Sequence, residues 1–290
     1  MKRILLDNRD LNSQKVLLKL KYSFRIENGA RLIKSGLLLL LMLSVFQSCK
    51  KDEKRPDDNG KGAKIIDKVV ENAGSENYDA STIEFTFRDL QYKSVRDCGM
   101  YELMRTKITA EGDTITDIVR NEGFTRLTNN ETTPLADSLQ IKYSNSVNSV
   151  HYFAQLPFGL NDQAVNKYYL TETFIKDKAY HEIEVTFDEI GGGSDHDDIY
   201  VYWVNTKTFT IDYFAYSYKT NGGGMRFREA FNPRTIKGIR FVDYKNYAPE
   251  EGTSPDLENM EKLFNENKLK QISTIETKNI EVTLSDKNCA

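Results

Sequence analysis

Residues 179–218 read AYHEIEVTFDEIGGGSDHDDIYVYWVNTKTFTIDYFAYSY and contain the strand pattern that decides the fold. Near the start of this segment, Ile183, Val185 and Phe187 alternate with polar residues, which is the period of a strand with one buried face. Residues 199–204 are apolar on both faces, so other elements must cover each side of that strand. Short turns separate these runs. The segment therefore predicts consecutive hairpins and antiparallel pairing.

Strands with the same character are predicted on both sides of this segment. They lie at residues 81–90, 100–109, 114–120, 124–127, 168–176, 225–231, 236–247 and 272–284. Three helices are predicted in the same part of the chain, at residues 63–73, 134–154 and 257–264. In the longest helix, Thr132-Thr133-Pro134 provides a hydroxyl cap with proline in the first turn, and apolar residues then recur at helical spacing.

This order of elements predicts an α+β fold that is mostly antiparallel β. We expect one large curved sheet or an unclosed barrel, with two or three helices packed on its concave side. Residues 63–287 are predicted to form this single β-rich domain, which is an ordinary size for one fold of this class.

The segment Lys34–Lys54, KSGLLLLLMLSVFQSCKKDEK, has a different character. Its apolar run is too short to span a bilayer, which needs about 20 residues. Basic residues precede the run and a small residue, Ser48, follows it, which is the pattern of a secretory signal peptide. We expect residues 1–48 to be a signal peptide with an atypical N-terminal extension, and residues 49–62 to be a flexible tether.

Cys49 follows Phe-Gln-Ser and resembles the lipid-modified cysteine of bacterial lipoproteins of the Bacteroidota type. Lys51, Asp52 and Glu53 resemble the signal that exports such lipoproteins to the outer face of the outer membrane. An ordinary solvated linker is the alternative for these three charges. The resemblance implies a lipid anchor at Cys49, a membrane as partner and a surface-facing position on the outer membrane.

Charge and cysteine content narrow the function classes. Cleavage before Cys49 removes nine Lys or Arg and three Asp or Glu, so residues 49–290 carry 31 basic and 40 acidic residues, a net charge of −9. This sign argues against a nucleic-acid partner. Cys98 and Cys289 would be free to pair in an oxidising compartment, and the sequence leaves that pairing open.

Three phrases, AKIIDKVVENAGSENYD, VHYFAQLPFGL and SDHDDIYVYW, resemble an uncharacterised family of Bacteroidota lipoproteins. The order of elements is similar to that of the LolA/LolB-like lipoprotein carriers, unclosed antiparallel barrels with helices on the concave side. That resemblance implies a cavity for acyl chains or another apolar ligand. We expect residues 134–154 to serve as its lid and the following residues to line it: Phe153, Leu156, Phe158 and Tyr202.

The loop GGGSDHDD gives the candidates for a metal site, Asp195, His196, Asp197 and Asp198. Three carboxylates and an imidazole in four residues suit a divalent cation such as calcium, but their spacing differs from known calcium loops. A solvated glycine-rich hairpin loop is the alternative. No other pattern predicts a metal or a cofactor.

No catalytic motif is present: the sequence lacks GxSxG, a phosphate-binding glycine loop and a zinc ligand set. We therefore expect a non-enzymatic binding protein for an apolar ligand such as an acyl chain. The alternative is a surface scaffold or glycan-binding module that uses exposed aromatic residues, with the GGGSDHDD loop holding calcium. A hydrolase is the third hypothesis, and it rests on Asp195 or His181.

Overall fold

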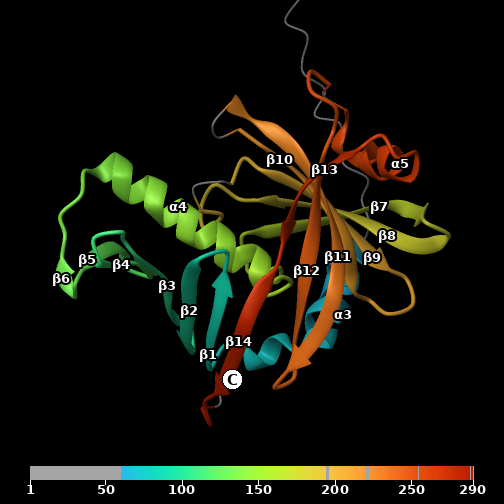
Figure 1. Ribbon diagram of the computed structural model, residues 1–290. Helices are drawn as coiled ribbons and strands as arrows, with labels where there is room; N and C mark the ends of the chain where they lie inside the picture. The colour runs from blue at the N-terminus through green and yellow to red at the C-terminus, as the bar shows by residue number, and fades with distance from the viewer. Residues whose placement is uncertain (1–59, 194–195, 220–221, 254, 288, 290) are drawn as a thin grey trace, which may run out of the picture. The chain divides into compact units, whose positions relative to one another are not determined.

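The computed structural model describes residues 60–290 apart from 194–195, 220–221, 254, 288 and 290. Within them, two seven-stranded antiparallel sheets form (Figure 1). Sheet A has, in spatial order, β14 (Thr277–Leu284), β1 (Ser81–Phe87), β2 (Leu90–Asp97), β3 (Met100–Ile108), β4 (Thr114–Arg120), β5 (Gly123–Thr128) and β6 (Glu131–Thr132). Sheet B has β13 (Lys270–Ile275), β12 (Ile239–Ala248), β11 (Gly224–Ile236), β10 (Ile211–Tyr218), β9 (Ile199–Asn205), β8 (Lys178–Phe187) and β7 (Val165–Ile175). The predicted fold, mostly antiparallel and unclosed, is confirmed.

One run of chain belongs to both sheets. β13 pairs with β12, and after Glu276 alone β14 begins to pair with β1. The buried carboxylate of Asp243 fixes this junction, because its Oδ1 accepts hydrogen bonds from the backbone N–H of Thr277 and from Arg234 Nη2, both at 3.0 Å. Figure 1 shows β14 leaving the end of β13 toward the C-terminus. The two sheets are therefore tied together at a defined point.

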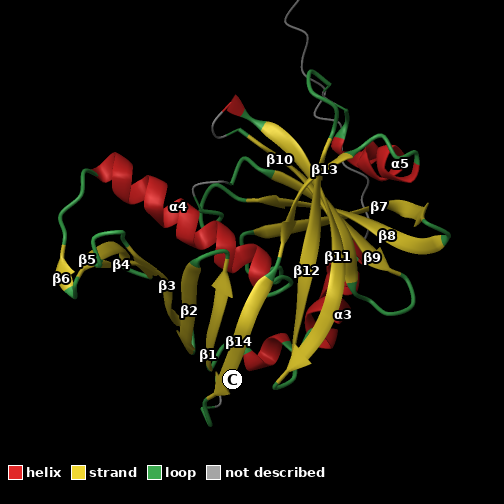
Figure 2. Ribbon diagram, in the orientation of Figure 1, coloured by secondary structure: helices red, strands yellow, loops and turns green. Residues whose placement is uncertain are grey.

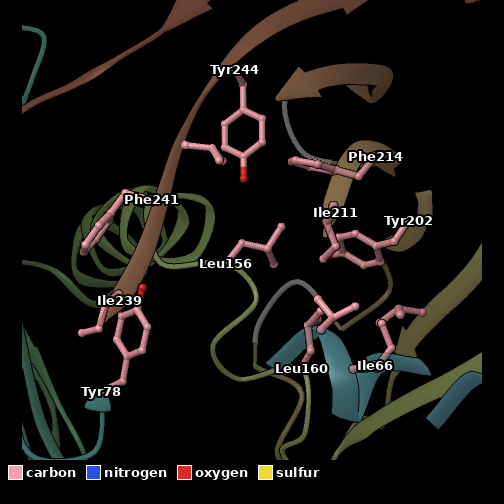
Figure 3. Close-up of a cluster of buried hydrophobic side chains, with 14 of the residues drawn as sticks. Ile66, Tyr78, Leu156, Leu160, Tyr202, Ile211, Phe214, Ile239, Phe241 and Tyr244 are labelled. Carbon is pink, nitrogen blue, oxygen red and sulfur yellow. The ribbon is translucent and has the colours of Figure 1, made fainter. Parts of the chain in front are cut away.

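The largest apolar cluster lies on the face of sheet B that helix α3 (Lys61–Asn72) covers. Ile65, Ile66 and Val69 form the buried stripe of α3 and belong to the same cluster as Tyr202 and Phe214 of the sheet. Figure 3 shows Ile66 beside Tyr202. The three residues of α3 are the i, i+1 and i+4 positions of one helix face. The amphipathic pattern of residues 63–73 therefore decided both the helix and its orientation.

α3 ends where the sequence predicted, just before Gly74. Gly74 has a φ of 69°, in the left-handed region that favours glycine. A Cβ atom at this position would also collide with the carbonyl oxygen of Gly238 in the β11–β12 turn. The backbone N–H of Arg240 donates a hydrogen bond to Ala73 O at 3.0 Å, which holds the helix end against the same hairpin.

The opposite face of sheet B is covered by helix α5 (Met260–Asn265), which follows a 3₁₀ turn at Leu257–Asn259 (Figure 2). Trp203 and Phe227 are fully buried there, and the Phe227 and Phe264 rings stack at 4.7 Å. This confirms that other elements cover both faces of residues 199–204. It also places α5 on the face opposite to α3, whereas we had expected the helices to share the concave side.

Helix α4 (Asp137–Ala154) begins three residues after the predicted start at Pro134. Thr132 lies in β6 opposite Leu127, and the hydroxyl of Thr133 donates to Thr128 Oγ1 at 2.8 Å. The two threonines are therefore used by the sheet edge. Ala136 precedes the helix and provides no side-chain cap.

Cys98, in the β2–β3 turn, forms a disulfide with Cys289, and their Cα atoms are 5.0 Å apart. This settles the pairing that the sequence left open. Disulfides persist mainly in oxidising compartments, so the bond indicates a location outside the cytoplasm. None of the helices in the described part of the chain has both the length and the apolar composition needed to cross a membrane.

Candidate ligand cavity

A cavity of about 700 Å³ opens between the C-terminal end of α4 and the two sheets. Its walls come from β2 and β3 of sheet A, from β9, β10 and β11 of sheet B, and from the loops around residues 155–164 and 188–193. Small-molecule sites in proteins are typically about 300–1,000 Å³. The cavity is therefore large enough for a substantial organic ligand.

The last turn of α4 reaches between the sheets and forms one wall. The hydroxyls of Tyr152 and Tyr202 are hydrogen-bonded at 2.8 Å, and the ring of Phe153 packs edge-on against Phe87 at 5.4 Å between centroids. These contacts hold the end of the helix to β9 in one sheet and β1 in the other. Its position in the cavity wall is consequently fixed from both sides.

Aromatic rings of sheet B form the facing wall. Tyr200 stacks on Tyr216 at 5.3 Å, Phe187 meets Tyr200 edge-on at 5.8 Å, and Phe214 lies 6.1 Å from Tyr216. Burial raises the pKa of Tyr200 and of Tyr202 behind it well above the usual value of 10. The hydroxyls therefore stay neutral at physiological pH, and this wall combines ring surface with uncharged polar groups.

Two arginines of β11 face the same space, because Arg228 lies opposite Phe214 and Arg226 opposite Tyr216 in the strand register. Only 8% of Arg228 is exposed. Its guanidinium carbon lies 4.9 Å from the ring centre of Phe153, 5.3 Å from that of Phe214 and 5.1 Å from that of Tyr216. Its Nη2 donates to the Tyr216 hydroxyl at 2.9 Å.

A third arginine, Arg96 of β2, lines the cavity from sheet A. Its guanidinium lies 4.3 Å from the ring centre of Phe158, and Nη2 donates to Gln155 Oε1 at 3.3 Å. Burial lowers the pKa of Arg96, and the nearby carboxylates of Asp79 and Asp162 oppose that effect. An arginine remains charged under all physiological conditions, so the cavity holds cations on both sides.

Two of the predicted lining residues, Phe153 and Phe158, lie in the cavity wall. The other two lie in the apolar core behind it: Leu156 is 4% exposed and Tyr202 is fully buried. Leu156 instead borders a small pocket of about 10 Å³ beside Val69 of α3. Two of the four predicted residues therefore line the cavity, and the other two support its wall from behind.

Two residues of the GGGSDHDD loop lie close together, since His196 Nε2 is 3.6 Å from Asp197 Oδ1. Asp197 forms an ion pair with Lys219, with 2.9 Å between carboxylate oxygen and Nζ, and His196 Nδ1 lies 3.1 Å from Gly193 O. Asp198 lines the cavity, and Asp195 lies outside the described residues. Across the part of the chain that the structure describes, no three His, Cys, Asp or Glu side chains gather as metal ligands.

The aromatic residues of 199–218 are all buried or half-buried, so they present no exposed platform of the kind that the glycan-binding hypothesis required. Cys49, Lys51, Asp52 and Glu53 lie outside the described residues. The anchor and export signal remain predictions from sequence.

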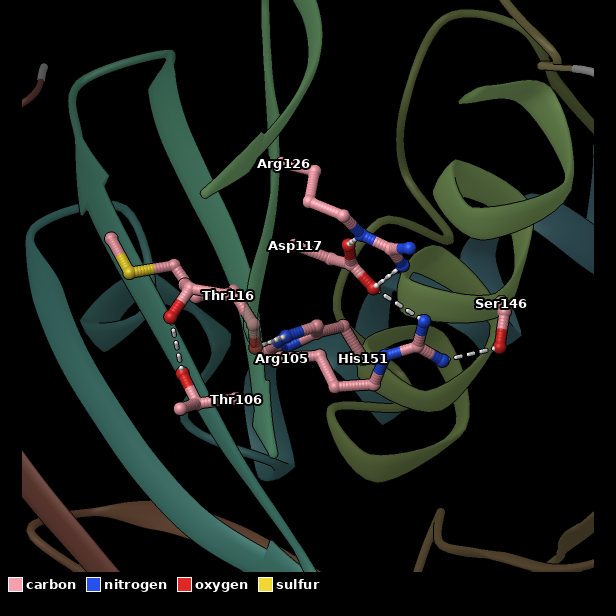
Figure 4. A network of polar contacts seen from close by, with 8 residues as sticks. Arg105, Thr106, Thr116, Asp117, Arg126, Ser146 and His151 are labelled. Carbon is pink, nitrogen blue, oxygen red and sulfur yellow. Dashed lines mark hydrogen bonds and ion pairs between the residues drawn. The ribbon is translucent and has the colours of Figure 1, made fainter. Parts of the chain in front are cut away.

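Polar contacts attach the middle of α4 to sheet A (Figure 4). Asp117 of β4 is buried and accepts hydrogen bonds from Arg105 Nη2 and Arg126 Nε, both at 2.6 Å. Arg105 Nη1 in turn donates to Ser146 Oγ of α4 at 2.6 Å, and Arg126 lies 3.8 Å from the ring centre of Tyr143. Two guanidinium groups thus link one carboxylate of the sheet to the helix.

Closer to the cavity, the side chain of His151 on α4 packs against sheet A. Its Nε2 lies 3.1 Å from Met104 O, and its Nδ1 lies 3.4 Å from Gln155 Nε2. Burial lowers the pKa of His151 from 6.5 to about 4, so the ring is neutral at pH 7. A neutral imidazole with N–H at Nε2 donates to the Met104 carbonyl and accepts from the Gln155 amide.

Arg96, Arg226 and Arg228 belong to no motif in the sequence, and none of them was predicted to line a site. Charged residues in an alternating strand usually face solvent, and this period alone does not say which face is buried. Residues 225–231 did contain a usable signal. Phe227 and Phe231 lie on one face of this strand and Arg226 and Arg228 on the other, so each face needed a partner.

Several solved structures are similar to this chain in fold. A LolA superfamily protein from Nitrosomonas europaea matches with a TM-score of 0.42 and 13% identity, over 78% of this chain and 94% of that one. An outer membrane lipoprotein-sorting protein domain from Vibrio parahaemolyticus matches with a TM-score of 0.39 and 9% identity, over 78% and 94%. The lipoprotein LppX from Mycobacterium tuberculosis matches with a TM-score of 0.25 and 7% identity, over 56% and 90%.

At the level of sequence, no curated protein matches the chain. Residues 36–277 match the profile of a family described as "Family of unknown function (DUF6503)". The match covers the whole apolar run of the predicted signal peptide and every strand except β14, of which it includes only Thr277.

Proposed function

The chain belongs to the DUF6503 family, and we propose that it is a lipid-anchored protein of the cell envelope whose cavity binds an apolar ligand such as an acyl chain. It binds this ligand without transforming it. Residues 63–287 are the binding domain, and residues 49–62 tether that domain to the membrane through Cys49.

The aromatic wall of the cavity is the observation that supports this proposal. Tyr200, Phe214 and Tyr216 of sheet B and Phe153 and Phe158 line the same space of about 700 Å³. Covering ring surface with a ligand chain gains about 25 cal/mol for each Å² of apolar area removed from water. A flexible chain gains most from such a wall because it can follow the ring surface.

Native mass spectrometry of residues 50–290, produced without detergent, tests the proposal. We expect a bound mass that leaves on denaturation and fits a lipid or a fatty acid. Phe153→Ser should lower its occupancy, because it replaces a ring of the wall with a polar group. Phe174→Ser is the matched control, since Phe174 is 63% exposed and distant in the fold on β7.

An unliganded mass that added fatty acid and phospholipid leave unchanged would refute the proposal. Equal loss of ligand in both variants would show that the bound lipid is not held in this cavity.

The anchor is tested separately. We expect Cys49→Ala to release the protein from membranes, because acyl chains bind through about 0.8 kcal/mol for each buried CH₂ group. Fractionation of cells that express either form measures this. Surface exposure through Lys51, Asp52 and Glu53 predicts that externally added protease degrades the wild-type protein, and that replacing all three with Ser protects it.

A further inference from the structure

We infer that the ligand carries an anionic head group, a carboxylate or a phosphate, which binds at Arg228 with Arg226 beside it. This inference rests on the proposed function and names the class of apolar ligand that the cavity takes: an amphipathic chain with an oxyanion at one end.

Arg228 is a buried cation without an anionic partner. It is 8% exposed, and no ion pair joins Arg96, Arg226 or Arg228 to a carboxylate within the described ranges. Removing a guanidinium group from water without a counter-charge is costly, and arginine cannot avoid the cost by losing its proton. An anion that enters the cavity would supply the missing charge.

The hydrogen bonds of Arg228 lead to the same conclusion. Its Nη2 donates to the Tyr216 hydroxyl, but its Nε is buried and has no hydrogen-bond partner. Buried donors are nearly always paired in proteins, so a free one beside a cavity marks a place for a ligand atom. The rings of Phe153, Phe214 and Tyr216 surround the guanidinium, which leaves its in-plane N–H groups as the contacts for an oxyanion.

Arg226 and Arg96 add positive charge to the same space. Arg226 lies two residues from Arg228 on the same strand face, about 6.6 Å along β11, and its Nη1 donates to Met225 O at 2.7 Å. Arg96 also has a buried Nε without a hydrogen-bond partner. Among the residues that the structure describes, Asp162 and Asp198 are the carboxylates that line the cavity, so three guanidinium groups accompany two carboxylates there. The whole chain has a formal net charge of −3.

This arrangement separates the two ends of a ligand. Phe187 and Tyr200, beyond the rings that cover Arg228, take the apolar chain, and Arg228 and Arg226 at β11 take the charged end. The aromatic rings lie within about 5 Å of the Arg228 guanidinium, so a ligand bound there also meets ring surface. A free inorganic anion has no apolar part to cover that surface. An oxyanion that continues into an alkyl chain would satisfy both the charge and the rings.

Photolabelling of the full chain in isolated membranes tests this. Two reporters of equal length are used, a photoreactive, alkyne-tagged palmitic acid and the corresponding hexadecanol, and peptide mass spectrometry locates the labelled residues. Unlabelled palmitic acid and hexadecyl phosphate compete in separate arms, which distinguishes a carboxylate from a phosphate head group. The variants are Arg228→Gln and Arg226→Gln, with the exposed Arg88→Gln as the matched control.

We expect the acid to label cavity residues at about ten- to hundredfold lower concentration than the alcohol, the range of one charged hydrogen bond or slightly more. Arg228→Gln should remove that preference and leave labelling by the alcohol unchanged, whereas Arg88→Gln should change neither. Arg226→Gln should reduce the preference less, because Arg226 is more exposed.

Equal labelling by acid and alcohol in the wild type would overturn the inference while the apolar cavity stands. The same would follow if Arg228→Gln weakened both reporters alike. If neither reporter labelled residues of the cavity, both the proposed function and this inference would be refuted. The wild-type comparison requires no variant, so a variant that fails to fold does not prevent a decision.

Discussion

Sheets A and B have the same number of strands, but they are stabilised differently. Sheet B is covered on both faces, by α3 and the end of α4 on one side and by α5 on the other, and Tyr202, Trp203 and Phe214 are almost fully buried in it. Where α4 crosses sheet A, the apolar contact is a small cluster of Leu103, Val119 and Val147, and a buried ion-pair network provides much of the remaining contact.

This difference indicates which wall of the cavity is the more rigid. The sheet B wall packs between two apolar layers, while the middle of α4 is held to sheet A by directional polar bonds. Apolar burial tolerates little rearrangement, whereas an ion-pair network depends on pH and on single groups. We therefore expect sheet B to be the stable wall and α4 on sheet A to be the more easily loosened one.

The largest effect should come from Trp203→Ala in sheet B. Trp203 is completely buried beneath α5, so its loss leaves a cavity and should cost about 3–5 kcal/mol of the free energy of unfolding. The half-buried Phe124→Ala in sheet A is the comparison and should cost less than half as much. Urea denaturation of both variants measures this, and equal losses would contradict the contrast between the sheets.

Asp117→Ala should cost about 3–5 kcal/mol, because it leaves the charges of Arg105 and Arg126 without their partner under α4. Burial raises the pKa of Asp117, but the hydrogen bonds from Arg126 and Arg105 outweigh it and the pKa is lowered. Hydrogen exchange should accelerate in residues 137–147 and remain unchanged in sheet B.

The control for this variant is Glu102→Ala, which breaks the more exposed Arg120–Glu102 pair on the same sheet and should cost less than about 1 kcal/mol. If Asp117→Ala accelerated exchange in both sheets to the same extent, the network would stabilise the whole fold and not α4 in particular.

Cys98→Ser with Cys289→Ser should cost about 2–4 kcal/mol, because the disulfide constrains a long loop of the unfolded chain. The loss should appear first as faster exchange in β14, β1 and β2 of sheet A. Thermal unfolding with and without reductant provides the same comparison in the wild type. A reductant-insensitive melting temperature would contradict it.

Lowering the pH should weaken the contact between α4 and sheet A. The pKa of His151 is lowered to about 4, so stability from its neutral form is present above pH 6.5 and is lost as the pH falls through 4. We expect a loss of about 2 kcal/mol over that range, and His151→Gln should flatten it. Melting temperatures from pH 7 to 4 measure the effect; an unchanged slope in His151→Gln would assign the acid sensitivity to other groups.

Raising the pH should destabilise sheet B, by less than acid destabilises the contact of α4 with sheet A. Burial, with the nearby carboxylates of Glu261 and Glu258, raises the pKa of Glu182 from 4.5 to about 8. Stability from its protonated form is present below pH 4.5 and is lost as the pH rises through 8. Glu182→Gln should raise the melting temperature at pH 8 by about 2–4 °C, or about 1 kcal/mol, and leave it unchanged at pH 4.5. A variant that melted lower at pH 8 would contradict this.

Much of the fold was predictable because apolar alternation specifies strands directly. The predicted strands at 81–90, 114–120 and 179–190 correspond to β1, β4 and β8, although β1 and β8 each end three residues before the predicted end. The double-sided pattern of residues 199–204 correctly required layers on both faces. β2 was missed. Its inward positions are Tyr92, Ser94 and Arg96, and two polar residues of three hid the alternation.

The helix start at Pro134 was wrong for a related reason. Thr132 and Thr133 have the chemistry of a cap, but a neighbouring strand edge competes for the same hydroxyl and backbone groups and binds them instead. In the cavity, Phe153 and Phe158 were predictable from their place at the end of an amphipathic helix and just beyond it. Leu156 and Tyr202 were predicted to line the same surface, because sequence alone does not distinguish a residue of the cavity wall from one that supports it from behind.

Most strands and all three described helices of this protein were predictable from sequence, because local periodicity and composition depend on neighbouring residues alone. The apolar leader and the anchor at Cys49 are predictions of the same kind. Long-range packing established the rest: β13 and β14 join two sheets, Cys98 meets Cys289, and Arg96, Arg226 and Arg228 line one cavity. Strands have two faces, and which face is inside depends on what packs against it from elsewhere in the chain.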